Sequence, residues 1–273
     1  MRTTTTVLAA GLGLVLLAAA CPVSAGLITL ADGNSTAQFL TDSDAGMFAW
    51  YVGDASYLAR QWFWYRLGDS GGESPINTLG APTITVLDTT GEGDPDFLRL
   101  RYADDDLRIE IVYSLVGGTP ASGRADLTET IRVVNQGDAP QDVHFFQYVD
   151  FDLSGYLYDD AVVIRGGNTA TQTWTGVTVA ETVVTPAPTR FQAGTFPHIL
   201  LSLEDGSPTT LDSTQTEASG DATWAFQWDF TLQPGGSFLI SKDKSLVVPE
   251  PATLAFLGLG LAGLLARRRR NGR

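Results

Sequence analysis

Residues 98–115 read LRLRYADDDLRIEIVYSL, and this stretch decides the fold class. Leu98, Leu100 and Tyr102 alternate with arginines, and apolar residues again occupy every second position from Leu107 onward. Alternation with a period of two predicts strands that turn one face toward a core and the other toward solvent. The three consecutive aspartates between the two runs predict the turn of a β-hairpin.

The same pattern extends outward from this hairpin in both directions. Alternate positions are mostly apolar or aromatic in residues 143–153 and again in residues 224–232, and the runs are separated by Gly, Pro, Asp and Asn. No convincing helical pattern occurs between Gly26 and Val248, and only residues 54–60 could hold one short helical turn. About 14 strands of this kind predict an all-β fold, an antiparallel β-sandwich of large, supersandwich-like size. We expect it to be a single domain over residues 26–246.

The chain is acidic, and the acidity is concentrated between its two ends. The 273 residues carry a formal net charge of −14, and residues 26–248 contain 30 acidic and 11 basic residues, a net charge of −19. Such a surface repels phosphate backbones, which argues against nucleic acid as a partner. It can attract divalent cations. The single cysteine, Cys21, precedes this part of the chain, so disulfide and thiol chemistry are excluded there.

The first 25 residues have the pattern of a secretory signal peptide. Arg2 supplies the positive start, an apolar stretch VLAAGLGLVLLAAA follows, and small residues precede Gly26. We expect export through the Sec translocon and cleavage between Ala25 and Gly26 by signal peptidase. The alternative is a lipoprotein acylated at Cys21, although the residue three positions earlier is an alanine rather than a large aliphatic residue.

The last residues hold the most specific pattern of the chain. It consists of Pro249, Glu250 and Pro251, the apolar stretch ATLAFLGLGLAGLLA over residues 252–266, and then Arg267, Arg268, Arg269 and Arg270. A helix over residues 252–266 would be about 22 Å long, short of the roughly 30 Å hydrocarbon core. Snorkelling arginines and local thinning of the bilayer offset the difference. The pattern predicts a transmembrane helix with its stop-transfer arginines in the cytoplasm and the body outside.

This tail closely resembles the PEP-CTERM sorting signal, over residues 247–273. The resemblance implies processing by an exosortase near Pro249–Pro251 and a precursor anchored in the inner membrane. It further implies delivery to the cell surface or extracellular matrix of a Gram-negative bacterium, with exopolysaccharide as a candidate partner. The body is not assigned to a characterised family, and a sorting tail carries no information about what the body binds.

Four aspartates close together in the sequence form the leading candidate metal site. They are Asp150, Asp152, Asp159 and Asp160. Asp150 and Asp152 lie on one strand face about 7 Å apart. A loop that brings Asp159 or Asp160 back to this pair would complete a set of oxygen ligands for calcium. The alternative is a solvated acidic strand face followed by a polar loop.

Two tryptophans suggest a second kind of site. Trp62 and Trp64 share one face of a predicted strand, with Phe63 and Tyr65 on the other. A strand that is apolar on both faces is usually covered on both, which predicts core residues. The alternative is an exposed platform on which sugar rings stack.

The sequence contains no recognisable catalytic set. His144 and His198 are the only histidines, so a zinc site is not expected, and no G-x-S-x-G motif occurs. We therefore expect an exported surface or matrix protein whose body is not an enzyme and whose ligand is unknown. The alternative is a secreted carbohydrate-binding or carbohydrate-active protein that uses exposed Trp and Asp side chains.

Overall fold

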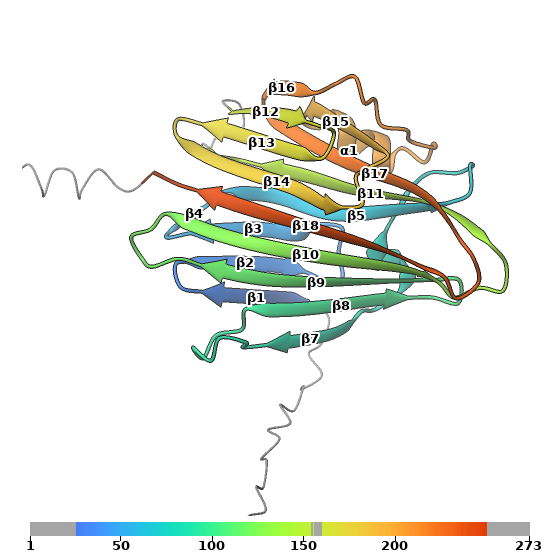
Figure 1. Cartoon of the computed structure of the whole chain (residues 1–273), viewed down its shortest axis with the longest axis horizontal. Helices are drawn as coiled ribbons and strands as arrows, with labels where there is room; N and C mark the ends of the chain where they lie inside the picture. The colour runs from blue at the N-terminus through green and yellow to red at the C-terminus, as the bar shows by residue number, and fades with distance from the viewer. Residues whose placement is uncertain (1–25, 154, 156–159, 250–273) are drawn as a thin grey trace, which may run out of the picture.

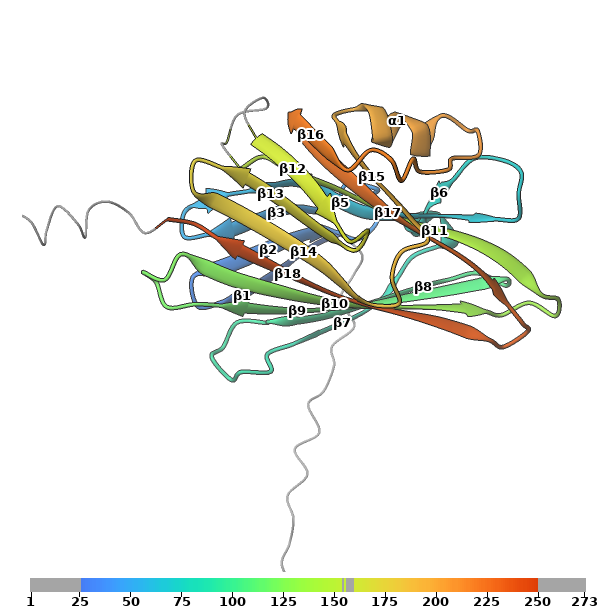
Figure 2. The same cartoon turned by 45° about the horizontal axis from the view of Figure 1, so that its top comes forward.

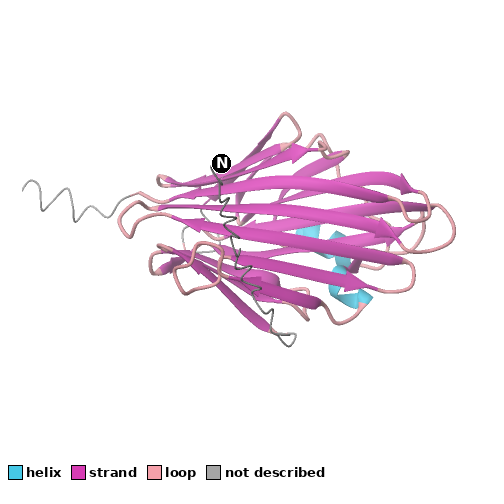
Figure 3. Cartoon of the chain, turned by 60° about the horizontal axis from the view of Figure 1, so that its bottom comes forward, coloured by secondary structure: helices cyan, strands magenta, loops and turns pink. Residues whose placement is uncertain are grey.

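A computed structural model describes residues 26–153, 155 and 160–249. These residues form two nine-stranded sheets that pack face to face (Figure 1), which confirms the predicted antiparallel β-sandwich. Strands make up most of the described chain (Figure 3). The signal peptide, Asp159 and the tail from Glu250 onward lie outside the described residues. The predicted transmembrane helix and its arginines belong to that tail.

The first sheet has the strand order β1-β2-β3-β5-β11-β17-β15, with β4 pairing to β3 and β6 to β5. Its strands are β1 (Leu27–Asp32), β2 (Ser35–Leu40), β3 (Gly46–Val52), β4 (Ala55–Ser56), β5 (Leu58–Leu67), β6 (Ser74–Pro75), β11 (Gln141–Phe151), β15 (Arg190–Thr195) and β17 (Ala222–Leu232). All pairings are antiparallel except a short parallel contact of β3 with β5.

The second sheet has the strand order β16-β12-β13-β14-β18-β10-β9-β8-β7. Its strands are β7 (Thr83–Leu87), β8 (Phe97–Ala103), β9 (Leu107–Gly117), β10 (Arg124–Asn135), β12 (Asp160–Arg165), β13 (Thr169–Trp174), β14 (Val177–Thr185), β16 (Glu217–Gly220) and β18 (Ser237–Val247). The described residues thus contain 18 strands rather than about 14, because two-residue strands such as β4 and β6 leave no readable periodicity.

The hairpin predicted for residues 98–115 is formed by β8 and β9. Leu98, Leu100 and Tyr102 are buried, while the arginines between them are exposed, as the alternation predicts. In the turn, Oδ1 of Asp104 accepts hydrogen bonds from the backbone N–H groups of Asp106 (2.9 Å) and Leu107 (2.7 Å). An aspartate that satisfies the backbone of its own turn in this way fixes where the hairpin reverses.

The interior between the sheets is rich in stacked aromatic rings. Phe63 stacks on Phe145 with ring centroids 5.6 Å apart, and Phe151 stacks on Trp224 at 5.7 Å. All four side chains are buried. Full burial of a large apolar side chain stabilises a fold by about 1.5–3 kcal/mol, so this interior accounts for much of the stability of a chain without disulfides.

The outer face of the first sheet departs from the sequence-based expectation. Alternation predicted that Ala225 and Gln227 of β17 face solvent, but both are buried. A short helix, α1 (His198–Glu204), lies over this part of the molecule (Figure 2), and the backbone N–H of Leu211 donates to Oε1 of Gln227 at 2.9 Å. The sheet is therefore covered on both faces here, so period-two alternation could not reveal which face is buried.

Helical structure in the described residues is short and was not predicted where it occurs. α1 places Ile199, Leu200 and Leu203 on its buried side, and a 3₁₀ helix, η1, spans Ile76–Leu79. Residues 54–60, which the sequence left open for one helical turn, instead form β4 and the start of β5. None of the helices in the described part of the chain is long and apolar enough to span a membrane.

Gly46 marks the point where β3 meets β5. Its φ is +56°, and a Cβ atom at this position would lie 2.1 Å from the indole ring of Trp62. Only glycine combines this left-handed backbone with so close an approach. The residue therefore lets the two strands touch and lets the indole of Trp62 pack beneath the backbone.

The chain crosses between the two sheets at both ends of the β11–β17 pair. At one end, Nδ2 of Asn135 donates to the carbonyl oxygens of Ala139 (2.8 Å) and Leu232 (3.0 Å), and its backbone N–H donates to Gly236 at 3.1 Å. These bonds join the crossing from β10 to β11 with the crossing from β17 to β18. At the other end, β11 leads toward β12 and β16 leads into β17.

Candidate functional site

Three aspartates gather at the end of the β11–β17 pair where the chain passes from β11 toward β12 and from β16 into β17. Asp150 is the second-to-last residue of β11, Asp152 follows the strand, and Asp221 lies between β16 and β17. Each offers a carboxylate oxygen, and these oxygens all lie within 4.8 Å of one another. Asp150 is 5% exposed, whereas Asp152 and Asp221 are half-buried, so the cluster opens toward solvent on the side of the last two.

Neighbouring side chains hold the cluster in place. The hydroxyl of Tyr148 donates to Oδ2 of Asp150 at 3.2 Å. The buried carboxylate of Asp160 accepts backbone hydrogen bonds from Ala222 (3.1 Å) and Leu153 (3.4 Å), which links the start of β12 to both chain crossings. Both carboxylate oxygens of Asp160 already accept backbone hydrogen bonds, so Asp160 supports the cluster from beside it.

The electrostatics of the cluster disfavour its own negative charge. Burial raises the pKa of Asp150 to about 7, and the charges of Asp152 and Asp221 add to the rise. Burial also raises the pKa of Asp152, and burial together with the charge of Asp152 raises the pKa of Asp221. The nearby Arg60 does not relieve this, because its guanidinium pairs with Asp44 (2.9 Å) and Glu204 (3.5 Å).

The structure brings together part of the set that the sequence suggested. Asp150 and Asp152 are neighbours as expected, and Asp160 lies beside them in a backbone-bonded role. Asp159 lies outside the described residues. The new member, Asp221, is far away in the sequence, and no local pattern indicates that the start of β17 returns to the end of β11.

Trp62 and Trp64 lie in the core. Neither indole has any exposed surface. Nε1 of Trp62 donates to Oδ1 of Asn77 in η1 at 3.1 Å, and Trp64 packs edge-on against Tyr148. A buried ring cannot stack on a sugar, so these two residues do not form the sugar-stacking platform that was the alternative to a core role.

A second group of charges lies in the interior and was not anticipated. Glu129, Glu181, Lys242 and Lys244, called the buried quartet below, have side chains with no exposed surface. Nζ of Lys242 lies 2.6 Å from Oε2 of Glu129 and 3.1 Å from Oε1 of Glu181, while Lys244 pairs with both glutamates. The only sequence signal is that these charges occupy buried positions of otherwise alternating strands.

The buried quartet is further tied to the facing sheet. Nε2 of Gln61 donates to Glu129 at 2.8 Å, and Nε1 of Trp224 donates to Glu181 at 3.1 Å. Burial opposes ionisation of Glu129, but the two lysines outweigh burial and lower its pKa. The quartet contains two charges of each sign, so it is an internally neutralised cluster rather than a group free to exchange protons with a substrate.

One histidine forms a carboxylate pair. Nδ1 of His144 lies 2.7 Å from Oδ1 of Asp229, which also accepts a hydrogen bond from Nε2 of Gln227 at 2.7 Å. A catalytic triad would need a hydroxyl or thiol on the other ring nitrogen. Among the described residues no such group is hydrogen-bonded to His144, and Nε2 has only Asp69 nearby, at 3.6 Å.

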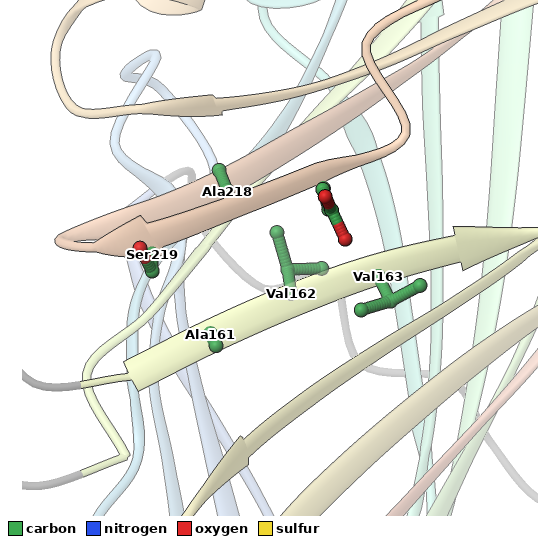
Figure 4. A pocket seen from close by; sticks show the side chains of 6 residues that line it. Ala161, Val162, Val163, Ala218 and Ser219 are labelled. Atoms are coloured by element: carbon green, nitrogen blue, oxygen red, sulfur yellow. The ribbon is translucent and has the colours of Figure 1, made fainter.

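A surface depression of about 260 Å³ lies between β12 and β16 (Figure 4). Its lining consists of Ala161, Val162, Val163, Glu217, Ala218 and Ser219. The lining is mostly methyl groups with a single carboxylate, so it offers little for catalysis. It lies next to the acidic cluster, because the paired residues Asp160 and Gly220 are adjacent to the pair Ala161 and Ser219 that lines the depression.

Comparison with known families identifies the tail. The PEP-CTERM protein-sorting motif matches residues 247–270, which confirms the sorting signal expected from the sequence. The chain thus carries the sorting signal of exported surface proteins that an exosortase processes. No curated protein matches the sequence significantly.

Solved structures resemble the body in fold. A bacterial glucoamylase complexed with acarbose has a TM-score of 0.57 at 12% identity, covering 89% of this chain and 35% of the other. A protein from Synechocystis sp. PCC 6803 has a TM-score of 0.49 at 8% identity, covering 84% of this chain and 98% of the other. A galactose mutarotase-like protein from Lactobacillus casei ATCC 334 has a TM-score of 0.44 at 11% identity, covering 81% of this chain and 100% of the other. The chain spans about a third of the glucoamylase, and at such identities the likeness establishes the fold alone.

Proposed function

We propose that the protein is a surface or extracellular-matrix protein of a Gram-negative bacterium, with a sandwich body that is not an enzyme. The chain enters the Sec translocon with its signal peptide, is held in the inner membrane by residues 252–266, and is then processed by an exosortase. The observation that carries this proposal is the sorting motif at residues 247–270. Exopolysaccharide of the matrix is the partner that such sorting suggests.

The junction between body and tail supports processing of a finished body. β18 ends at Val247, and the backbone N–H of Val248 donates to the carbonyl of Gly123 at 2.7 Å. Pro249 is exposed. Cleavage close to Pro249–Pro251 would leave every described strand intact, so the anchor can be removed without cost to the sandwich.

The arrangement of the ionisable groups favours a body that is not a catalyst. Glycosidases place their two carboxyl groups on either side of the scissile bond, with the sugar between them. Here three carboxylates crowd within 4.8 Å, and the buried quartet has no exposed surface. Crowded oxygens suit binding of a cation better than attack on a glycosidic bond.

Carbohydrate binding is the second candidate function. The glucoamylase with the same fold is complexed with acarbose, a sugar-like ligand, although this chain corresponds to about a third of that protein. Trp174 is half-buried, whereas the other five tryptophans are buried, so it is the tryptophan best placed for a stacking contact. A glycan array probed with wild-type chain and with Trp174→Ala distinguishes the candidates, since binding that depends on Trp174 would favour the second.

Alanine substitution of Pro249, Glu250 and Pro251 together tests the sorting proposal in the native host. We expect the variant to accumulate as a larger, membrane-associated precursor, because the exosortase motif is lost. Cell fractionation and immunoblotting measure size and location. Pro120→Ala, in an exposed loop, is the matched control and should be processed like wild type. Normal processing of the triple variant would contradict the proposal.

A further inference from the structure

The two ends of the β11–β17 pair are built differently. Both ends carry two crossings of the chain between the sheets. At one end the crossings are joined by hydrogen bonds of Asn135. At the other end the same kind of junction gathers Asp150, Asp152 and Asp221, which are all acceptors when ionised and cannot bond to one another.

The buried oxygen of Asp150 makes this end incomplete. Oδ1 of Asp150 is buried and has no hydrogen-bond partner among the described residues, while its Oδ2 receives only the hydroxyl of Tyr148. A buried carboxylate oxygen without a donor is costly unless a cation or a proton compensates it. Since two further carboxylates lie within 4.8 Å, one cation could satisfy all three at once.

We propose that Asp150, Asp152 and Asp221 bind a calcium ion at the junction of the two sheets. Calcium takes six to eight oxygen ligands in flexible geometry, so three aspartates and water from the open side suffice. All three protein ligands are carboxylates, which favour hard cations such as calcium over zinc. Magnesium demands near-ideal octahedral geometry and gives up water reluctantly, so it fits a half-buried cluster less well.

Calcium at this place would link the crossings that hydrogen bonds link at the other end. Asp150 and Asp152 belong to the crossing from β11 toward β12, and Asp221 belongs to the crossing from β16 into β17. Asp160, engaged by the backbone of Leu153 and Ala222, positions both segments around the ion. The ion therefore stabilises the packing of one sheet against the other.

Thermal unfolding of the purified full-length chain tests this site. Extracellular calcium modules bind with dissociation constants of about 10⁻⁴–10⁻³ M, so the comparison is between excess EDTA and about 10 mM CaCl₂. For a body of this size we expect calcium to raise the melting midpoint of wild type by at least about 3 °C. Asp150→Asn and Asp221→Asn should fold, because asparagine keeps the shape, but should lose the shift.

A matched control separates binding at the cluster from a general effect of charge. Asp105→Asn removes one exposed aspartate from the β8–β9 turn and should keep the full calcium shift. An unchanged midpoint in wild type, or equal shifts in wild type and Asp150→Asn, would overturn the proposal. The same titration with MgCl₂ should give a smaller shift.

Terbium luminescence gives a readout that does not depend on stability. Tyr148 contacts Asp150, and Trp64 packs on Tyr148, so Tb³⁺ bound at the cluster should be sensitised by ultraviolet excitation of these rings. We expect the signal to be displaced by CaCl₂ and lost in Asp150→Asn and Asp221→Asn. Emission that persists unchanged in both variants would show that the cation binds elsewhere and refute the assignment.

Discussion

At the scale of single residues, burial decides what each tryptophan does. Five of the six tryptophans are fully buried, namely Trp50, Trp62, Trp64, Trp224 and Trp228. Most of their indole N–H groups find an acceptor, such as Ser35 for Trp50 at 2.9 Å and the carbonyl of Pro186 for Trp228 at 3.2 Å. A buried indole contributes large apolar area and one satisfied hydrogen bond, so these residues stabilise the sandwich rather than bind ligand.

Trp62→Ala tests this role. We expect it to reduce the free energy of unfolding by about 3–5 kcal/mol, because it leaves a cavity beside Gly46 and an unpaired amide oxygen on Asn77. Urea denaturation followed by circular dichroism measures the change. Trp174→Ala, at a half-buried position, should cost at most about half as much. A stable Trp62→Ala protein that has lost a ligand would contradict the core assignment.

At the scale of elements, β18 joins the second sheet through charges as well as backbone hydrogen bonds. Its Lys242 and Lys244 pair in register with Glu129 of β10 and Glu181 of β14, so one strand supplies both cations and its two neighbours supply the anions. Nζ of Lys242 also lies 5.0 Å from the ring of Phe63 in the facing sheet. Buried pairs cost much desolvation, so we expect this cluster to select strand register more than to add stability.

Lys242→Met is expected to destabilise the protein by about 3–5 kcal/mol, because it leaves a buried glutamate uncompensated. The double variant Glu129→Gln/Lys242→Met should recover much of this loss, since glutamine keeps the acceptor for Gln61 and removes the charge. Chemical denaturation of both variants measures the difference. The neighbouring, exposed Asp243→Asn serves as the control and should change stability by no more than about 0.5 kcal/mol. A double variant as unstable as the single one would contradict this account.

At the scale of the whole molecule, both edge strands of the first sheet are hydrogen-bonded to segments that lead into strands of the second sheet. The carbonyls of Gln215 and Thr216, just before β16, accept hydrogen bonds from Ala193 of β15 (2.8 Å) and Ile164 of β12 (2.7 Å). On the other side, the backbone N–H of Ala31 in β1 donates to Pro95 at 2.7 Å. An edge strand whose backbone is already hydrogen-bonded in this way is less open to pairing with strands of other chains, which suits an acidic, exported protein.

A chain that ends at Val248 tests whether the body is independent of its tail. We expect it to unfold in one cooperative transition, as the predicted single domain requires, with a melting midpoint within about 2 °C of full length. The reason is that Val248 makes the last backbone hydrogen bond between the described strands and this end of the chain. Differential scanning calorimetry measures both quantities. Failure to fold, or two separate transitions, would contradict the expectation.

The sequence alone determined the features that depend on local pattern. Period-two alternation predicted the sandwich, because a strand with one buried face records that burial in every second residue. The proline–glutamate–proline segment, the apolar stretch and the arginine cluster predicted the sorting tail, because bilayer and exosortase act on contiguous residues. The pairing of Asp150 with Asp152 was also predictable, since both lie at the end of one strand.

Only the tertiary structure decided what depends on contacts between distant segments. Asp221 joins Asp150 because β17 pairs with β11, and nothing near Asp221 in the sequence records that pairing. Ala225 and Gln227 are buried by a covering segment that period-two alternation cannot show. The buried quartet likewise exists because three strands come together in one register. Alternation shows which residues share a strand face, but the fold decides whether that face is buried and what buries it.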